Sequence, residues 1–239
     1  SATHLLTEMM KLGLFDNPYV DPEAALAVAN DPESQKIADD AHRRSIVLLR
    51  NDNILPLGDD AISDVRLYVE MFPGGENAED TEGLKQKIRN YDKSITIVDN
   101  LEDATHAFVW VKPFQDLFAN QPTVEIGPET GVDQVERIVE IQKTVPTITA
   151  INFANPWLIN TIEPNAAAVI GTFGTKAEAV FEMIRGKFKP VGKLPITIPA
   201  SQEAVQNEAG DVPGFDEDPS YTYQDKAGNR YQYNFGLSY

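Results

Sequence analysis

The alternation of short β-branched runs with longer amphipathic runs constrains the fold of this chain most strongly. Runs of strand length, rich in Val, Ile, Thr and aromatic residues, cover residues 65–71, 94–98, 106–112, 147–153 and 167–173. Runs with helical periodicity cover residues 81–91, 131–144 and 176–188. Strands that alternate with helices predict an α/β fold in which a mostly parallel, open sheet is sandwiched between helices.

The apolar character of these strands also predicts where a ligand would bind. Runs such as HAFVWVK (residues 106–112) are nearly continuous in apolar residues, which is typical of a parallel strand buried on both faces. Ligands of such sheets bind beyond the carboxyl ends of the strands. The loops that follow Met71, Lys112, Phe153 and Phe173 are therefore the expected ligand-binding loops.

The N-terminal part of the chain lies outside this alternating pattern. A first helix is predicted to end at Gly13, and an extended segment follows over residues 15–22. A second helix is predicted over residues 34–51, with Ser34 as its N-cap. We accordingly divide the chain into an interdomain connection with a linker helix (residues 1–33) and an α/β-sandwich domain (residues 34–239).

The regular pattern fades after Ala200, which predicts an irregular C-terminal tail over the surface of the domain. Four tyrosines stand out in it, and their rings suit the apolar face of a pyranose ring. Such a stripe more often covers a core, so a packing role is favoured. The tyrosines are Tyr221, Tyr223, Tyr231 and Tyr233.

The net charge excludes several classes of partner. Twenty Lys and Arg against 37 Asp and Glu give a formal net charge of −17, which repels nucleic-acid backbones and anionic membrane surfaces. We therefore expect no nucleic-acid partner and no membrane partner. The chain has no cysteine, and its three histidines are not spaced as a ligand pair, so no metal and no cofactor is expected.

Two further residues are candidates for contact with a substrate. Glu76 lies in the glycine-rich stretch PGGENAED (residues 73–80), which lacks the spacing of a phosphate loop but could line a cleft. Trp157 follows an expected strand end and could lie at the edge of a substrate-binding site, although packing in the core is the favoured interpretation.

Five short motifs, in order along the chain, resemble the C-terminal part of a glycoside hydrolase family 3 enzyme of the β-glucosidase type. They are KLGLFDNPY (11–19), AHRRSIVLLRNDNILPL (41–57), GKLPITIP (192–199), DVPGFD (211–216) and FGLSY (235–239). The resemblance implies an α/β-sandwich second domain, in agreement with the alternating pattern. It also implies that residues 192–199 form a strand at a sheet edge after a tight turn at Gly192.

The resemblance implies an activity that this chain does not carry by itself. Retaining members use two carboxyl groups about 5 Å apart, a nucleophile and an acid/base. The nucleophile, an aspartate, belongs to a preceding (β/α)8 barrel domain that these residues do not contain. The implied function is that of a domain that caps the active site of the barrel in an exo-acting β-glycosidase, and the implied substrate is a β-linked oligosaccharide or glucoside.

The second domain of such enzymes commonly supplies the acid/base, in a Ser-Gly-Glu-Gly type of motif on a loop after a strand. The corresponding loop here follows residues 106–112 and contains no Gly-Glu-Gly. Its carboxylates are Asp116, Glu125 and Glu129. Asp116 and Glu125 are the candidate acid/base residues, with Asp116 preferred because it is nearest to the strand end, whereas Glu129 suits the start of the next helix.

The missing Gly-Glu-Gly motif leaves an alternative open. The domain would then be a carbohydrate-binding or interaction module with no catalytic residue. On either interpretation the partner implied by the resemblance is the barrel domain of the same enzyme. Many members of the family are exported, so the resemblance favours a secreted or periplasmic location.

Overall fold

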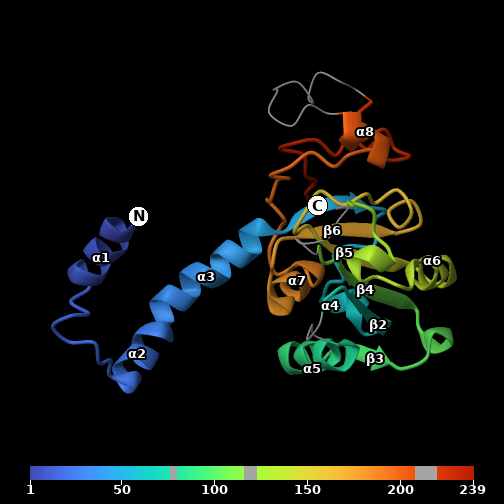
Figure 1. Cartoon of the computed structure of the whole chain (residues 1–239). Coiled ribbons are helices and arrows are strands. Elements are labelled where there is room, and N and C mark those ends of the chain that lie inside the picture. Colours follow the sequence, from blue (N-terminus) through green and yellow to red (C-terminus); the bar gives the residue numbers. More distant parts are fainter. Residues whose placement is uncertain (76–79, 116–122, 208–219) are drawn as a thin grey trace. The chain divides into compact units, whose positions relative to one another are not determined.

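The computed structural model describes residues 1–75, 80–115, 123–207 and 220–239, and the chain divides into two compact units, Ser1–Asp40 and Ala41–Tyr239 (Figure 1). The boundary lies within a helix, whereas the sequence analysis started the sandwich domain at Ser34. Within the described residues, no helix is both long enough and apolar enough to cross a membrane.

The first unit is helical. Helix α1 (Ala2–Lys11) ends just before Gly13, whose φ of 70° is the predicted left-handed stop. Helix α2 (Pro22–Ala29), which the sequence analysis did not predict, begins where the Asp21 side chain accepts the Glu23 amide at 2.9 Å.

Helix α3 (Pro32–Ser45) runs from the first unit into the second. It begins before Ser34, whose amide donates to the Asp31 side chain at 2.8 Å, so the predicted N-cap at Ser34 is wrong. Asp31 is the N-cap of α3, because its carboxylate accepts the amide of a residue in the first helical turn.

The described part of the second unit contains a six-stranded, mostly parallel sheet with helices around it, which confirms the predicted fold class. The strand order is β1-β6-β5-β4-β2-β3. Strand β1 is antiparallel to β6, and the other neighbours are parallel. The strands are β1 (Val47–Asn51), β2 (Arg66–Pro73), β3 (Thr96–Val98), β4 (His106–Lys112), β5 (Thr147–Asn152) and β6 (Ala168–Thr172).

Strand β1 corrects the prediction of one long helix over residues 34–51. The helix stops at Ser45, and the apolar residues that follow pair with β6, for example Leu48 with Ile170. Leu48 and Leu49 are buried. The run has strand composition, and its pairing with a strand more than a hundred residues away decides its conformation.

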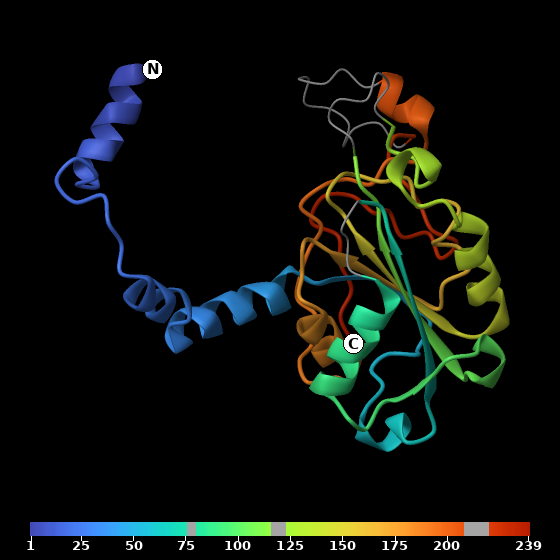
Figure 2. The same cartoon turned by 60° about the horizontal axis from the view of Figure 1, so that its bottom comes forward.

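Both faces of the sheet are covered, as Figure 2 shows. Phe108 and Trp110 of β4 share one apolar cluster with the side chains of α5 (Thr81–Tyr91) and α7 (Ala177–Ile184). Alternate residues of β4, such as Val109, share a second cluster with α6 (Val135–Thr144). Each large apolar side chain buried this way contributes about 1.5–3 kcal/mol. Shorter elements are α4 (Asp59–Ile62), η1 (Leu101–Asp103), η2 (Pro128–Thr130) and α8 (Gln202–Asn207).

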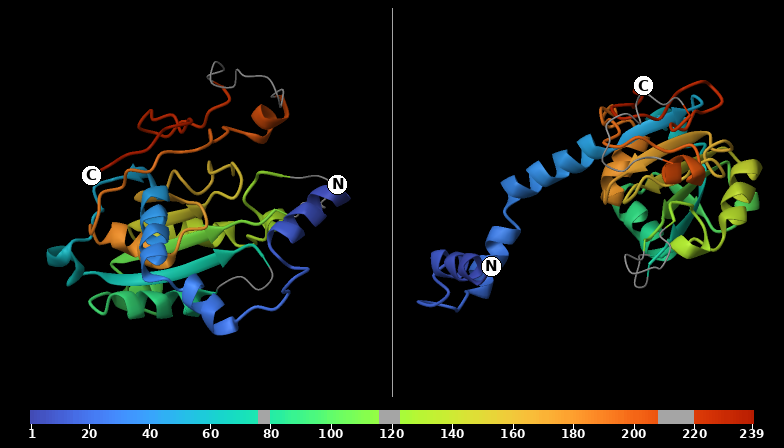
Figure 3. Two further views of the ribbon diagram at one scale, coloured as in Figure 1. Left: turned by 90° about the vertical axis from the view of Figure 1, so that its left-hand side faces the viewer. Right: turned by 45° about the horizontal axis from the view of Figure 1, so that its top comes forward.

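The C-terminal residues form part of the cover over the second cluster and do not simply lie on the surface (Figure 3). Tyr231 is fully buried and Tyr223 is 7% exposed, whereas Tyr233 is 61% exposed. The favoured packing role is therefore confirmed for Tyr223 and Tyr231. Their rings lie edge to face, with centroids 5.4 Å apart.

Residues 192–199 do not form the predicted edge strand of the sheet. They pair with the end of the chain instead: the Leu194 amide donates to Phe235 O at 2.8 Å, and the Ile198 amide donates to Tyr231 O at 2.8 Å. Near β1, the Leu237 amide donates to Leu48 O at 2.7 Å. The final residues thus occupy backbone positions that an edge strand would have used.

Gly192 is needed for a close approach of two backbones and not for a tight turn. A Cβ atom there would lie 2.2 Å from Ile46 O and 3.0 Å from Arg44 O. Gly236 lies on the other side of the same contact, because a Cβ atom at that position would be 2.5 Å from Gly192 O. These glycines allow the C-terminal segment to pack against the start of β1.

We predict that Gly192→Ala lowers the free energy of unfolding by about 1–3 kcal/mol, the usual cost of forcing extra atoms into a packed interior. Urea unfolding followed by circular dichroism measures this change. Gly58→Ala is the matched control, because a Cβ atom at Gly58 meets nothing within 4 Å. Equal stability of the two variants would contradict the close-approach argument.

Candidate functional site

The carboxyl ends of four parallel strands meet at one edge of the sheet. Strands β2, β4, β5 and β6 end at Pro73, Lys112, Asn152 and Thr172. The loop after β4 reaches α6, and its described residues from Thr123 onward lie beside the β5–β6 connection. This is the edge at which open α/β sheets bind ligands.

Glu125 has an exposed side chain on a backbone that is held on both sides. Its amide donates to Thr123 Oγ1 at 3.0 Å, and its carbonyl accepts from Thr130 Oγ1 at 3.1 Å. The adjacent Val124 carbonyl accepts the Leu158 amide at 2.8 Å, which makes a single parallel bridge to the β5–β6 connection. The carboxylate therefore projects from a fixed stretch of chain.

Two hollows share Glu125 and Ile126. The first, which we name the acidic groove, has a volume of about 560 Å³. Four carboxylates line it: Glu125, Glu129, Asp133 and Glu136. The second, which we name the polar pocket, has a volume of about 210 Å³. Its polar lining residues besides Glu125 are Asn160, Thr161, Ser201 and Gln202.

The other predicted site residues fall into two groups. Asp116 and Glu76 lie outside the described residues. Glu129 is exposed in η2 and does not begin the next helix, which starts at Val135. The structure thus places Glu125 and Glu129 in one groove.

Trp157 lies in the core. Its side chain is fully buried in the second apolar cluster, and its Nε1 donates to Asn152 O at 3.0 Å. No face of the ring is exposed to a sugar in this structure. The favoured packing interpretation matches this position, because a strand end in a two-sided sheet still lies beneath the cover.

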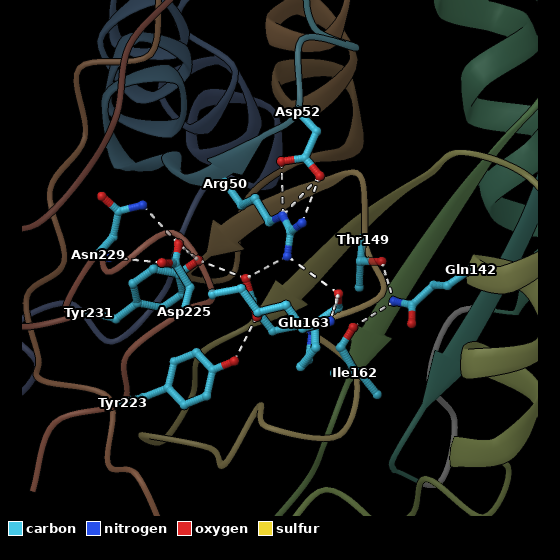
Figure 4. Close-up of polar contacts among 12 residues, drawn as sticks. Arg50, Asp52, Gln142, Thr149, Ile162, Glu163, Tyr223, Asp225, Asn229 and Tyr231 are labelled. Atoms are coloured by element: carbon cyan, nitrogen blue, oxygen red, sulfur yellow. Dashed lines mark hydrogen bonds and ion pairs between the residues drawn. The ribbon is translucent and has the colours of Figure 1, made fainter. Parts of the chain in front are cut away.

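A buried carboxylate that the sequence analysis did not identify lies in the β5–β6 connection. Glu163 is fully buried, and Figure 4 shows three side chains that converge on it. Tyr223 Oη donates to Oε2 at 2.6 Å, Tyr231 Oη donates to Oε1 at 3.0 Å, and Arg50 Nη1 lies 3.4 Å from Oε1. These contacts satisfy the carboxylate, as a buried charge requires.

Further acidic groups surround this cluster. Arg50 Nη2 also lies 2.7 Å from Asp52 Oδ2, and Tyr231 Oη lies 3.5 Å from Asp225 Oδ2. Hydrogen bonding to Asp52 and the charges of Asp52 and Glu163 raise the pKa of the Arg50 guanidinium. The cluster joins β1 to the C-terminal segment through Arg50. Glu163 and both tyrosines are buried, so the Glu163 carboxylate is not presented to a substrate.

Burial is the largest cause of the high pKa of both phenols in this cluster. It raises the pKa of Tyr223, with the hydrogen bond to Glu163 adding to the effect. It also raises the pKa of Tyr231, with the charges of Glu163 and Asp225 adding to the effect. Among the described residues there is no group of three or more His, Cys, Asp or Glu side chains placed to hold a metal ion.

A mostly parallel sheet between helices, with an acidic groove beside the carboxyl ends of its strands, defines an α/β-sandwich domain with a candidate ligand site at that edge. Residues 46–239 match the model of the glycosyl hydrolase family 3 C-terminal domain. The chain therefore belongs to this family, which confirms the resemblance found in the sequence.

Relatives of the chain include fungal and bacterial proteins. "Beta-glucosidase C" of Emericella nidulans is 32% identical over 230 residues, which cover 93% of this chain and 34% of that protein. "Periplasmic beta-glucosidase/beta-xylosidase" of Dickeya chrysanthemi is 24% identical over 220 residues, which cover 89% of this chain and 31% of that protein. The chain thus spans about a third of the length of these relatives.

Solved structures share the fold. A beta-glucosidase from Listeria innocua in complex with glucose has a TM-score of 0.61 and 16% identity, over 98% of this chain and 37% of that one. A beta-glucosidase involved in saponin metabolism from intestinal bacteria has a TM-score of 0.66 and 17% identity, over 98% of this chain and 42% of that one.

The buried phenols predict a loss of stability at alkaline pH. A phenol whose pKa is higher in the folded than in the unfolded state keeps its proton on folding, so its contribution is complete below about pH 10 and is lost above it. Each such tyrosine steepens the fall in unfolding free energy by up to about 1.4 kcal/mol per pH unit.

Tyr223→Phe should therefore reduce this alkaline slope relative to the parent chain. Urea unfolding at intervals between about pH 6 and pH 11.5 measures it. Between about pH 6 and pH 8, where a phenol is protonated in both states, the two curves should run parallel. Curves that stay parallel up to the highest pH would show that Tyr223 ionises as readily in the folded chain as in the unfolded one.

Proposed function

We propose that this chain is the second domain of a retaining, exo-acting β-glycosidase and caps the active site of a (β/α)8 barrel. The observation that carries the proposal is the acidic groove. It lies at the edge where open α/β sheets bind ligands, in a domain of the glycosyl hydrolase family 3 C-terminal type. In the proposed enzyme the groove faces the mouth of the barrel and forms the wall nearest the leaving group.

Two observations support a barrel partner. The chain spans about a third of its relatives, so most of their length lies in other residues. The unit Ser1–Asp40 also exposes many large apolar side chains and buries none in its helices, so a partner that covers them would remove apolar surface from water. The most exposed of them are Leu5, Met10, Leu12, Tyr19, Val20, Val28 and Ile37.

The proposed reaction is a double displacement through a covalent glycosyl intermediate. An aspartate of the barrel is the nucleophile, and Glu125 or Asp116 of this chain is the acid/base. A general acid must hold its proton near neutral pH, which requires burial or a neighbouring charge. An exposed loop carboxylate meets that requirement when the barrel covers it.

The polar pocket supports a hydroxylated leaving group. Amide and hydroxyl side chains from two elements surround it next to Glu125, and such groups can both donate to and accept from sugar hydroxyls. The four carboxylates of the adjoining groove disfavour an anionic leaving group. We therefore propose neutral β-linked glucosides or short oligosaccharides as substrates.

We predict that the 239-residue chain alone releases no 4-nitrophenol from 4-nitrophenyl β-glucoside, whereas a longer polypeptide that also contains the barrel does. The two should differ because the barrel supplies the nucleophile, without which the glycosidic bond is not cleaved. Continuous absorbance assays at equal protein concentration make the comparison. Hydrolysis by the chain alone would reject the proposal, and a longer polypeptide that binds cellobiose without hydrolysing it would favour a non-catalytic binding module.

In that longer polypeptide, replacement of the acid/base should slow hydrolysis of substrates with poor leaving groups by about 10²–10⁴-fold. Glu125→Gln and Asp116→Asn test the two candidates. The variant of the true acid/base should recover activity with an activated leaving group such as 2,4-dinitrophenolate, or with added azide. An activated leaving group departs without a proton from the protein, and azide attacks the glycosyl intermediate without a general base.

Glu102→Gln provides the control for the loss of one exposed carboxylate. Glu102 lies in η1, which precedes β4 and therefore lies away from the carboxyl ends of the strands. Full activity of both Glu125→Gln and Asp116→Asn on poor leaving groups would reject the assignment of the acid/base to this loop.

A further inference from the structure

Thr130 connects Glu125 to the edge of the sheet. Its side chain is 1% exposed, and its Oγ1 accepts the Gly127 amide at 3.0 Å. The single hydroxyl proton is directed between two carbonyls, Gly127 O at 2.9 Å and Glu125 O at 3.1 Å. One buried hydroxyl therefore fixes both ends of the turn that carries Glu125.

The backbone at Thr130 fixes this turn to the strands. The Thr130 carbonyl accepts the amide of Phe114, which follows β4, at 3.0 Å. Gly131 has a φ of 74° and packs so closely on Gly74, which follows β2, that a Cβ atom on Gly131 would lie 2.1 Å from Gly74 O. The Gly74 amide in turn donates to Lys112 O at 2.8 Å.

These contacts form a continuous path from the ends of β2 and β4 through Thr130 to the Glu125 backbone. We propose that Thr130 is a positioning residue, whose hydroxyl sets the place of the Glu125 carboxylate for proton transfer to the leaving group. This inference rests on the proposed function, in which Glu125 is a candidate acid/base.

Loss of the Thr130 hydroxyl affects both the loop and the reaction. Without the hydroxyl, the partly buried Gly127 amide and Glu125 carbonyl lose a partner, which favours a rearranged turn. Proton transfer requires heavy atoms about 2.6–3.2 Å apart, and a misplacement of about 1 Å costs about 10²-fold in rate. A small shift of the turn therefore lowers the rate of the proton-transfer steps that use the Glu125 carboxylate.

The test uses the longer polypeptide with the barrel and a series of aryl β-glucosides of increasing leaving-group pKa. Thr130→Val replaces the hydroxyl by a methyl group of similar size, and Thr130→Ser retains the hydroxyl. We expect Thr130→Val to lower kcat/KM by about 10–100-fold for poor leaving groups and by less than about threefold for 2,4-dinitrophenyl glucoside. Thr130→Ser should remain within about threefold of the parent for the whole series.

Thr130→Ala is the second variant if Thr130→Val does not fold, because it removes the hydroxyl without placing a second methyl group beside polar backbone. Thermal unfolding of each variant shows whether the fold is retained. The pH profile provides a second measurement, since its acid/base limb should move in Thr130→Val and stay in place in Thr130→Ser. A residue that acts through stability alone would leave that limb unchanged.

Glu125→Gln in the same series separates this inference from the proposed function. If Glu125→Gln steepens the dependence on the leaving group while folded Thr130→Val or Thr130→Ala matches the parent, the inference about Thr130 is overturned. An equal loss for all leaving groups, or an equal loss in Thr130→Ser, overturns it as well. If Glu125→Gln matches the parent, the role of Glu125 fails and the inference fails with it.

Discussion

The burial of both faces of β4, β5 and β6 is the constraint on which the rest of the structure depends. Successive residues of β4 enter opposite apolar clusters, with Phe108 and Trp110 in one and Ala107 and Val109 in the other. Such strands leave no face that could remain in water, so helices and irregular segments of the described part of the second unit must cover both faces. The acidic groove lies outside this cover, beside the loop that follows the carboxyl end of β4.

The two faces obtain their cover in different ways. Helices α5 and α7 pack on one face, and helices satisfy their own backbone groups. On the other face α6 shares the cover with irregular segments of the β5–β6 connection and the C-terminus. Irregular segments bring polar groups into a core, and these need partners inside it. The hydroxyls of Tyr223 and Tyr231 find theirs on Glu163, and Arg50 balances its charge.

The sequence predicts those elements of the fold whose residue pattern lies within one segment, and it fails where contacts between distant segments decide the structure. Two-sided burial appears directly as apolar runs of strand length in β4, β5 and β6, and β2 and β3 are marked by their β-branched residues, so these strands could be located from sequence. Strand β1 was assigned to a helix because nothing between Ser45 and Val47 breaks the pattern, and only pairing with β6 makes it a strand. Glu163 had no local signal, since its tyrosine partners lie 60 and 68 positions further along the chain.

The candidate site shows a further limit of sequence. The five family motifs identify a domain, but the usual acid/base motif is absent from the loop after β4, so the sequence leaves two candidate carboxylates, Asp116 and Glu125, with Asp116 preferred for its place near the strand end. The structure adds that the Glu125 backbone is held by the hydroxyls of Thr123 and Thr130 and by a bridge to Leu158.

A fixed but exposed carboxylate is what an active centre shared between two domains requires. In the proposed enzyme, position and environment have separate sources. The loop on this chain supplies the position, because its contacts to the ends of β2 and β4 are already made within the chain itself. The barrel supplies the environment, because closing a second wall over the groove excludes water and strengthens every charge interaction inside it. Such a division keeps a proton-transfer group inactive in either domain alone and effective only where the two surfaces meet.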